Sequence, residues 1–198
     1  MDSNLIKEAM SGNSDAQYRL GKRYVESEPN TDKAKMWFAA ASNQGHKRAK
    51  YELALILLSE DGDNTAEVCA LLKESAASGD VDATLMLCRL YSDGVGIDSD
   101  VVIRCLRYCS DNGSNQCKLK LAEMLYKSDK REDRMESKVL CYELAVAGNK
   151  DAMFRLYLHY RYPLSEKTNM DLAKFWLQKA IDNGHKGALK EQATLSED

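Results

Sequence analysis

The sequence predicts an all-α protein, a right-handed α-solenoid of about five helix-pair repeats with a half-repeat at each end. Apolar residues recur with the period of an α-helix, and no stretch alternates as a strand would. The intervals between successive turn glycines are 33, 34, 34, 35 and 36 residues, a regularity typical of repeat proteins. Each glycine is followed four residues later by a small residue, in the pairs Gly12/Ala16, Gly45/Ala49, Gly79/Ala83, Gly113/Cys117, Gly148/Ala152 and Gly184/Ala188.

The first repeat, about residues 16–45, shows how the elements are assigned. The apolar faces of its two helices are marked by Ala16, Leu20 and Tyr24, and then by Ala34, Trp37, Phe38 and Ala41. Pro29 and Asn30 break the run between the two helices, and we predict that Asp32 is the N-cap of the second helix. Gly45 ends that helix, because glycine adopts a left-handed conformation without steric cost.

The other repeats follow at about residues 49–79, 83–113, 117–148 and 152–184. Their two helices are separated by breaks near Gly62, at Gly94 to Gly96, at Asp129 to Asp133 and at Pro163. Capping helices are expected at about residues 3–11 and 187–195. Because one pair of about 34 residues cannot bury its apolar face alone, neighbouring pairs must stack into a continuous core. We therefore expect residues 1–198 to form a single domain.

Composition excludes several functional classes. The 28 Lys and Arg residues and 31 Asp and Glu residues give a net charge of -3, whereas a general binder of nucleic-acid backbones carries a basic excess. The longest apolar run, Leu53 to Leu58, is far shorter than a bilayer span. The first residues include no apolar segment of a secretory signal. We expect a cytoplasmic protein with no nucleic-acid or membrane partner.

The residues that recur at fixed positions carry a family resemblance. In the first repeat they are Ala16, Leu20, Gly21, Tyr24, Asp32, Lys33, Ala34, Trp37, Phe38, Ala41, Gly45 and His46. Later in the chain they are Asp93-Gly94-Val95-Gly96-Ile97-Asp98, and Leu172, Ala173, Trp176, Ala180, Gly184 and His185. This pattern resembles the Sel1-like repeats, which are related to the tetratricopeptide repeats, over about residues 5–193. The resemblance implies an adaptor for other proteins.

The sequence offers no catalytic centre. His46 and His185 each follow a turn glycine, so we interpret both as having the same structural role at the turn. His159 stands alone among tyrosines, and Gly94-Val95-Gly96 lacks the preceding strand that a nucleotide-binding loop requires. No metalloprotease, phosphate-binding or nucleophile-elbow motif is present. We predict no catalytic residue, no cofactor and no metal site.

The six cysteines divide into two groups. Cys69, Cys105 and Cys141 map to inward positions of second helices, and Cys88 takes the position of Gly21, so these four are interpreted as small buried residues. Cys109 and Cys117 flank Gly113. Secreted Sel1-like proteins have disulfide-bonded cysteines at this separation, so the resemblance implies a possible disulfide here, which a reducing cytosol would oppose. A zinc site at Cys105, Cys109 and Cys117 lacks a fourth ligand.

The candidate partner-binding residues come from the tetratricopeptide plan, in which the first helix of each pair lines a concave groove. One set of predicted groove positions is Tyr18, Tyr51, Leu85, Leu119 and Phe154, and the next is Lys22, Leu55, Arg89, Glu123 and Leu158. Apolar and aromatic side chains flanked by both charges suit an extended peptide or a helix. The alternative is that these residues pack against the preceding pair as part of the core.

We therefore expect a non-enzymatic interaction module that binds a protein or peptide in this groove. An immunity protein that neutralises one toxin is an alternative, and the residues do not separate the two. A hydrolase of the cysteine-rich Sel1-like type is a second alternative, although no nucleophile and base are paired in the sequence. The chain is expected to be a monomer, or a heterodimer with its partner.

Overall fold

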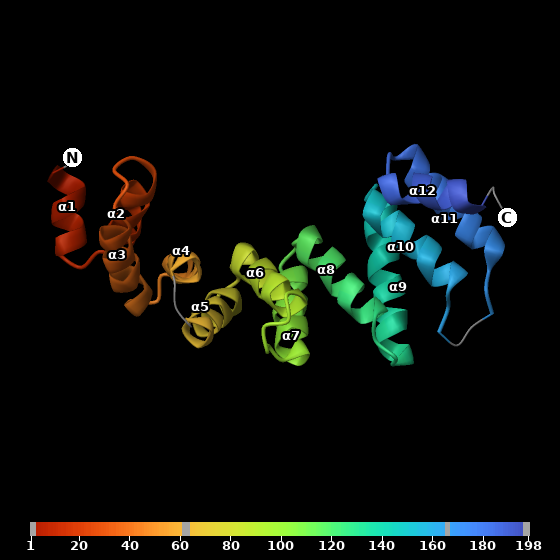
Figure 1. The fold of residues 1–198 in the computed structure, drawn as a ribbon, viewed down its shortest axis with the longest axis horizontal. Coiled ribbons are helices and arrows are strands. Elements are labelled where there is room, and N and C mark those ends of the chain that lie inside the picture. The colour runs from red at the N-terminus through yellow and green to blue at the C-terminus, as the bar shows by residue number, and fades with distance from the viewer. Residues whose placement is uncertain (1–2, 61–63, 165–166, 196–198) are drawn as a thin grey trace. The chain divides into compact units, whose positions relative to one another are not determined.

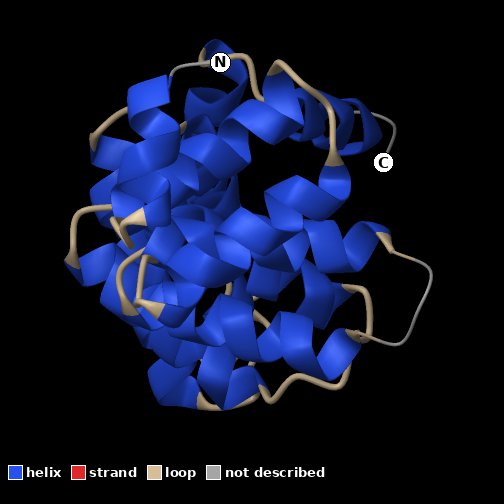
Figure 2. Cartoon of the chain, turned by 90° about the vertical axis from the view of Figure 1, so that its left-hand side faces the viewer, coloured by secondary structure: helices blue, strands red, loops and turns tan. Residues whose placement is uncertain are grey.

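The computed structural model describes residues 3–60, 64–164 and 167–195, and within these ranges every regular element is an α-helix (Figures 1 and 2). The described part of the chain contains one helix, five helix pairs and one closing helix, which confirms the predicted all-α repeat fold. The helices are α1 (Ser3–Met10), α2 (Ser14–Glu26), α3 (Thr31–Asn43), α4 (Lys47–Ser59), α5 (Thr65–Ala77), α6 (Val81–Ser92), α7 (Ser99–Asp111), α8 (Asn115–Tyr126), α9 (Arg131–Val146), α10 (Lys150–Arg161), α11 (Met170–Asp182) and α12 (Lys186–Leu195).

The chain forms two compact units. Unit 1 spans Met1–Gly113 and unit 2 spans Ser114–Asp198. Unit 1 contains α1 to α7, and unit 2 contains α8 to α12. The prediction that residues 1–198 form a single domain stays a prediction.

The predicted turn glycines end the second helices as expected. Gly45 has φ +85°, and the corresponding glycines of the other repeats also have positive φ. After Gly45, the backbone N–H of His46 donates a hydrogen bond to the carbonyl of Ala41 at 3.1 Å. This bond satisfies a carbonyl at the helix end. The predicted breaks at Gly94 to Gly96, Asp129 to Asp133 and Pro163 fall at or beside interhelix loops, although α9 already begins at Arg131. Gly62 lies outside the described residues.

One predicted cap was wrong. The N-cap of α3 is Asn30, whose Oδ1 accepts a hydrogen bond from the backbone N–H of Lys33 at 2.9 Å. Asp32 lies in the first turn instead, where its carboxylate faces the positive end of the helix dipole. Because Asn30 has an extended backbone, with φ -151°, its side chain can reach back over the first turn.

The core of unit 1 explains why Gly21 stands where α2 and α3 meet. A Cβ at Gly21 would lie 2.7 Å from two ring carbons of Phe38, a fully buried ring. Cys88, at the corresponding position of α6, is also buried. A small side chain is therefore needed here, as the repeat predicted.

Gly21→Ala is expected to lower the free energy of unfolding by about 1 kcal/mol. Overpacking against the Phe38 ring costs about 1–3 kcal/mol, and the helix propensity of alanine recovers up to about 1 kcal/mol. Urea unfolding measures the difference. Gly96→Ala is the control, since nothing lies within 4 Å of its added Cβ. A Gly21→Ala protein as stable as the wild type would contradict the close packing.

The core of unit 2 is one continuous cluster of buried side chains from α8 to α12. Its largest fully buried members include Leu156 and Tyr157 on α10. The cluster consists of Ala122, Cys141, Leu144, Ala145, Ala152, Met153, Leu156, Tyr157, Ala173, Trp176, Leu177, Ala180 and Ala188. The helix pairs of this unit therefore share a core, as stacked repeats require.

Candidate functional site

All ten predicted groove residues lie on the first helices of their pairs. Nine of them are half-buried, and Arg89 is exposed. Unit 1 carries Tyr18 and Lys22 on α2, Tyr51 and Leu55 on α4, and Leu85 and Arg89 on α6. Unit 2 carries Leu119 and Glu123 on α8, and Phe154 and Leu158 on α10. Half-burial is compatible with both a binding surface and packing, so the contacts of each residue matter.

The two tyrosines of unit 1 differ in what they contact. The Tyr18 ring stacks on His46, with 4.5 Å between ring centroids, and lies 5.9 Å from the Phe38 ring. The ring of Tyr51 has the guanidinium of Arg48 at 5.7 Å from its centroid. Partial burial, together with Asp82 and other nearby carboxylates, raises the pKa of Tyr51. Tyr18 thus packs against aromatic rings of its own repeat and of the next, whereas the Tyr51 ring lies beside the guanidinium of Arg48.

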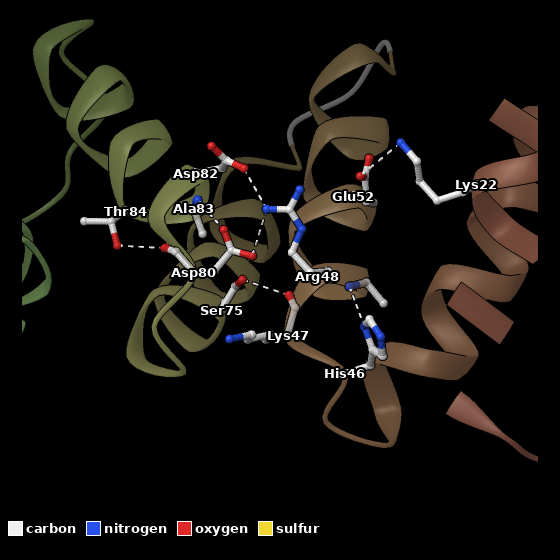
Figure 3. A network of polar contacts seen from close by, with 11 residues as sticks. Lys22, His46, Lys47, Arg48, Glu52, Ser75, Asp80, Asp82, Ala83 and Thr84 are labelled. Atoms are coloured by element: carbon white, nitrogen blue, oxygen red, sulfur yellow. Dashed lines mark hydrogen bonds and ion pairs between the residues drawn. The ribbon is translucent and has the colours of Figure 1, made fainter. Parts of the chain in front are cut away.

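Ion pairs link successive first helices of unit 1 (Figure 3). Lys22 on α2 contacts Glu26 at 2.9 Å and Glu52 on α4 at 3.4 Å. Arg48 on α4 reaches α6, where it contacts Asp82 at 2.6 Å. The hydrogen bond with Asp82 is the main cause of the raised pKa of Arg48. Lys22, a predicted groove residue, is therefore engaged between repeats.

Asp80 is the buried centre of this network. Its side chain is the N-cap of α6, where Oδ1 accepts the backbone N–H of Ala83 at 3.1 Å. Its Oδ2 lies 3.5 Å from Arg48, and its backbone carbonyl accepts the hydroxyl of Thr84 at 2.9 Å. Figure 3 shows the Arg48 guanidinium between Asp80 and Asp82. The network was missed from the sequence, although Arg48 and Asp82 lie at equivalent positions of adjacent repeats.

The two histidines that follow turn glycines have the same structural role, which confirms the prediction. His46 Nδ1 accepts the backbone N–H of Ala49 at 3.1 Å, and His185 Nδ1 accepts that of Ala188 at 2.9 Å. Each Nε2 faces a carboxylate one repeat earlier, Asp15 at 3.2 Å and Asp151 at 3.4 Å respectively. The rings stack on Tyr18 and Phe154. These histidines are helix caps that join neighbouring repeats.

In unit 2 the predicted groove residues have many internal contacts. Leu119, Phe154 and Leu158 pack against the buried cluster. The Phe154 ring also stacks on His185 at 4.4 Å. Glu123 is paired with Lys120 at 2.8 Å and with Arg155 at 3.2 Å. The alternative of packing therefore has more support in unit 2 than in unit 1.

A buried serine–histidine pair lies in unit 2, and sequence reasoning missed it. His159 Nε2 is 2.9 Å from the hydroxyl of Ser137, which donates to the backbone carbonyl of Ala122 at 2.7 Å. Since the one hydroxyl proton is used there, the imidazole donates to serine and does not act as its base. Burial and the charges of Arg134, Lys138 and Arg155 lower the pKa of His159 to about 3. The pair holds α9 to α8 and α10.

Of the three cysteines on second helices that were predicted to be buried, Cys69 and Cys141 are buried and Cys105 is half-buried. Cys69, Cys105 and Cys141 are free thiols, and burial raises the pKa of Cys141 to about 12. Cys109 and Cys117 are both buried. The disulfide between these two stays a prediction that thiol counting can test. Among the described residues, no group of three or more His, Cys, Asp or Glu side chains is arranged to hold a metal ion.

No described helix combines the length and the apolar character needed to cross a membrane.

Two families of helical repeats match parts of the chain. The family described as plant tetratrico peptide repeats matches residues 5–94, and the Sel1 repeat family matches residues 81–110 and 150–185. No curated protein matches the chain.

Solved structures of bacterial repeat proteins are similar to the chain. A Sel1 repeat protein from Oxalobacter formigenes is 20% identical, with a TM-score of 0.74, over 95% of this chain and 81% of that one. A protective antigen of uropathogenic Escherichia coli, which has an SLR fold, is 22% identical, with a TM-score of 0.67, over 98% of this chain. The chain spans 43% of the antigen's length. At these identities the likeness shows the fold alone.

The fold and these matches define a helical repeat protein. Its matches are to tetratricopeptide repeats in one part and to Sel1 repeats in others, each over less than half of the chain. Proteins built from such repeats are generally non-catalytic scaffolds that bind other proteins.

Proposed function

We propose that the chain is a non-enzymatic interaction module that binds a protein or peptide along the first helices of unit 1. The observation that carries the proposal is a row of half-buried apolar side chains, Tyr51 and Leu55 on α4 and Leu85 on α6. The Lys22–Glu52 ion pair joins α2 to α4, and the Arg48–Asp82 ion pair joins α4 to α6, so both help to fix the relative positions of the first helices. A preformed surface of this kind loses little conformational entropy when a partner binds.

The chemistry of the surface favours an extended peptide or a helix with apolar anchors. Tyr51 offers an aromatic face with a cation beside it, and Leu55 and Leu85 offer aliphatic contacts. The Arg89 side chain is 75% exposed, 3.9 Å from Asp93, and can pair with an acidic group at the edge of the ligand. Tyrosine and arginine are the residue types that most often dominate interface energies.

Tyr51→Ala is expected to weaken partner binding by about 2 kcal/mol, since a good aromatic anchor contributes that much. Because the Tyr51 side chain is only half-buried, we expect a small change in melting temperature. The measurement is affinity capture with the tagged chain from its native lysate, followed by titration of the captured protein against wild type and variant.

Tyr108→Ala is the matched control, because Tyr108 is an exposed tyrosine of the same unit on a second helix, α7. It should bind as the wild type does. A large loss of stability in Tyr51→Ala with binding intact would place Tyr51 in the core. A single stoichiometric partner that survives stringent washing would favour a dedicated inhibitor, such as an immunity protein, whereas several partners lost on washing would favour an adaptor.

A further inference from the structure

The second helix of the fourth pair, α9, differs from the others on the face opposite its core. Its buried residues are Ser137, Cys141, Leu144 and Ala145. On the opposite face it exposes four large apolar side chains, Met135 at 53%, Val139 at 58%, Tyr142 at 54% and Val146 at 69%. We call these four residues the outer stripe. At 16 residues, α9 is also the longest described helix.

The repeat itself does not require an outer stripe. When the pairs are aligned on their turn glycines, the other second helices carry mostly small or charged residues at its four positions. These are Asp32, Met36, Ala39 and Asn43 in α3, Ala66, Ala70, Lys73 and Ala77 in α5, Asp100, Arg104, Arg107 and Asp111 in α7, and Asp171, Phe175, Gln178 and Asp182 in α11. Exposed apolar patches of this kind mark interaction sites.

The spacing of the outer stripe is that of a coiled coil. Its members are separated by four, three and four residues, the heptad pattern of a helix that packs against another helix. In this register Val139 and Val146 take the a positions, and Met135 and Tyr142 take the d positions. β-Branched residues at a favour two parallel strands when Leu is at d, and here apolar Met135 and Tyr142 take the d positions.

The charges beside the outer stripe favour a second copy of α9 as the helix that packs on it. One edge carries Arg131 and Lys138 at the g positions, and the other carries Glu136 and Glu143 at the e positions. In a parallel pair, each g residue lies beside the e residue five positions later in the other helix, because both positions flank the same apolar seam. A second α9 would therefore place opposite charges together at both heptads. In an antiparallel pair, the two basic edges would lie together and the two acidic edges would lie together.

Contacts inside unit 2 hold two of these side chains at the edges of the stripe. The ammonium of Lys138 lies over the Tyr160 ring, 4.3 Å from its centroid. Glu143 is 2.9 Å from Lys118, and its side chain remains 53% exposed. In a parallel pair of α9 helices, ion pairs between the two chains would form in addition to these internal contacts.

We propose that the outer stripe is a homodimer interface, in which α9 pairs in parallel with α9 of a second copy of this chain. The contact runs for about 24 Å, at 1.5 Å per residue. Val139 and Val146 meet their counterparts across a two-fold axis, and Arg131 faces Glu136 of the partner subunit. This interface is separate from the proposed peptide-binding surface of unit 1, and a dimer differs from the monomer expected from the sequence.

Sedimentation velocity over a range of protein concentrations tests the proposal. The wild type is expected to rise from the 22.2 kDa of one chain toward twice that mass, and Val139→Glu should stay at the mass of one chain. The matched control is Met36→Glu, at the aligned position of α3, where the side chain is 54% exposed. It should associate as the wild type does. A wild type that stays monomeric at the highest concentration, or a Val139→Glu protein that still dimerises, would overturn the proposal.

Charge variants test the parallel pairing. Arg131→Glu places two carboxylates together, and Glu136→Arg places two cations together, so each variant alone should dimerise about tenfold more weakly. An equimolar mixture of the two should regain the wild-type affinity, because each partner then supplies the opposite charge. Damage to the fold would not be repaired by mixing. If the mixture dimerises no more tightly than either variant alone, this register is excluded.

Discussion

At pH 5, unit 2 is expected to be about 2 kcal/mol less stable than at pH 7.5 because of His159 alone. Its side chain is 5% exposed. Burial, with Arg134 and Lys138 on α9 and Arg155 on α10, lowers its pKa from 6.5 to about 3. No carboxylate is among the charges that shift this pKa, and the Tyr126 ring stands edge-on to the imidazole at 4.7 Å.

The sign follows from proton binding. Between pH 6.5 and about 3, the unfolded chain takes up a proton at His159 that the folded chain does not. The free energy of unfolding therefore falls as pH falls through this window, by about 1.4 kcal/mol per unit. The stabilisation is fully present above pH 6.5. The lowered pKa of His185 acts in the same direction, so His159 must be isolated by a variant.

His159→Gln is expected to remove about 2 kcal/mol of the difference between pH 7.5 and pH 5. Urea unfolding of unit 2 can be followed by Trp176, a core residue of this unit, in a Trp37→Phe background, since the chain has two tryptophans. The control is His185→Asn, because asparagine caps other helices of this chain, as Asn149 does for α10. A pH dependence that is the same with and without His159 would show that this imidazole titrates normally.

The repeat period predicted most of the fold because it reports a local constraint. Each turn glycine has a positive φ, and glycine is the residue type that accepts it without cost. The exact start of α3 was not predictable from residue types, because Asn30 and Asp32 are equally good caps. The backbone conformation at Asn30 decided between them.

Contacts between repeats were harder to predict than the repeats themselves. The Arg48–Asp82 pair joins residues 34 positions apart, which is one repeat, so aligned positions could have indicated it. The Ser137–His159 pair spans 22 positions and follows no repeat interval. The outer stripe of α9 was readable as a heptad, but its exposure depends on which face of the helix packs in the core. Which face of α9 packs in the core is known only from the tertiary structure.

Half-burial explains why the candidate groove was only partly predictable. A position two residues after a core alanine is at the edge of the helix interface, so the neighbouring side chain decides its role. Tyr18 meets the ring of His46, and Phe154 meets that of His185. Tyr51 has no histidine at the corresponding turn, where Asp80 caps α6 instead. The capping residue of the next repeat thus determines whether the aromatic side chain has a ring to stack on.

Asp80→Ala is expected to lower the free energy of unfolding of unit 1 by about 2 kcal/mol. This is the upper end of the cost of losing an N-cap, because the N–H of Ala83 that loses its acceptor at 3.1 Å is buried and an unsatisfied buried donor carries a desolvation cost. Arg48 keeps its 2.6 Å contact with Asp82, so the loss of the Asp80 ion pair adds little.

Two variants separate the cap from the charge. Asp80→Asn retains an acceptor for Ala83 and should cost less than about 1 kcal/mol, whereas Asp82→Ala removes the closer, exposed partner of Arg48 and should cost about 0.5 kcal/mol. Unfolding of unit 1 can be followed by Trp37 in a Trp176→Phe background. If Asp80→Asn were as destabilised as Asp80→Ala, the ion pair with Arg48 would be the main contribution of Asp80. Asp80 would then stabilise the contact between α4 and α6 more than the start of α6.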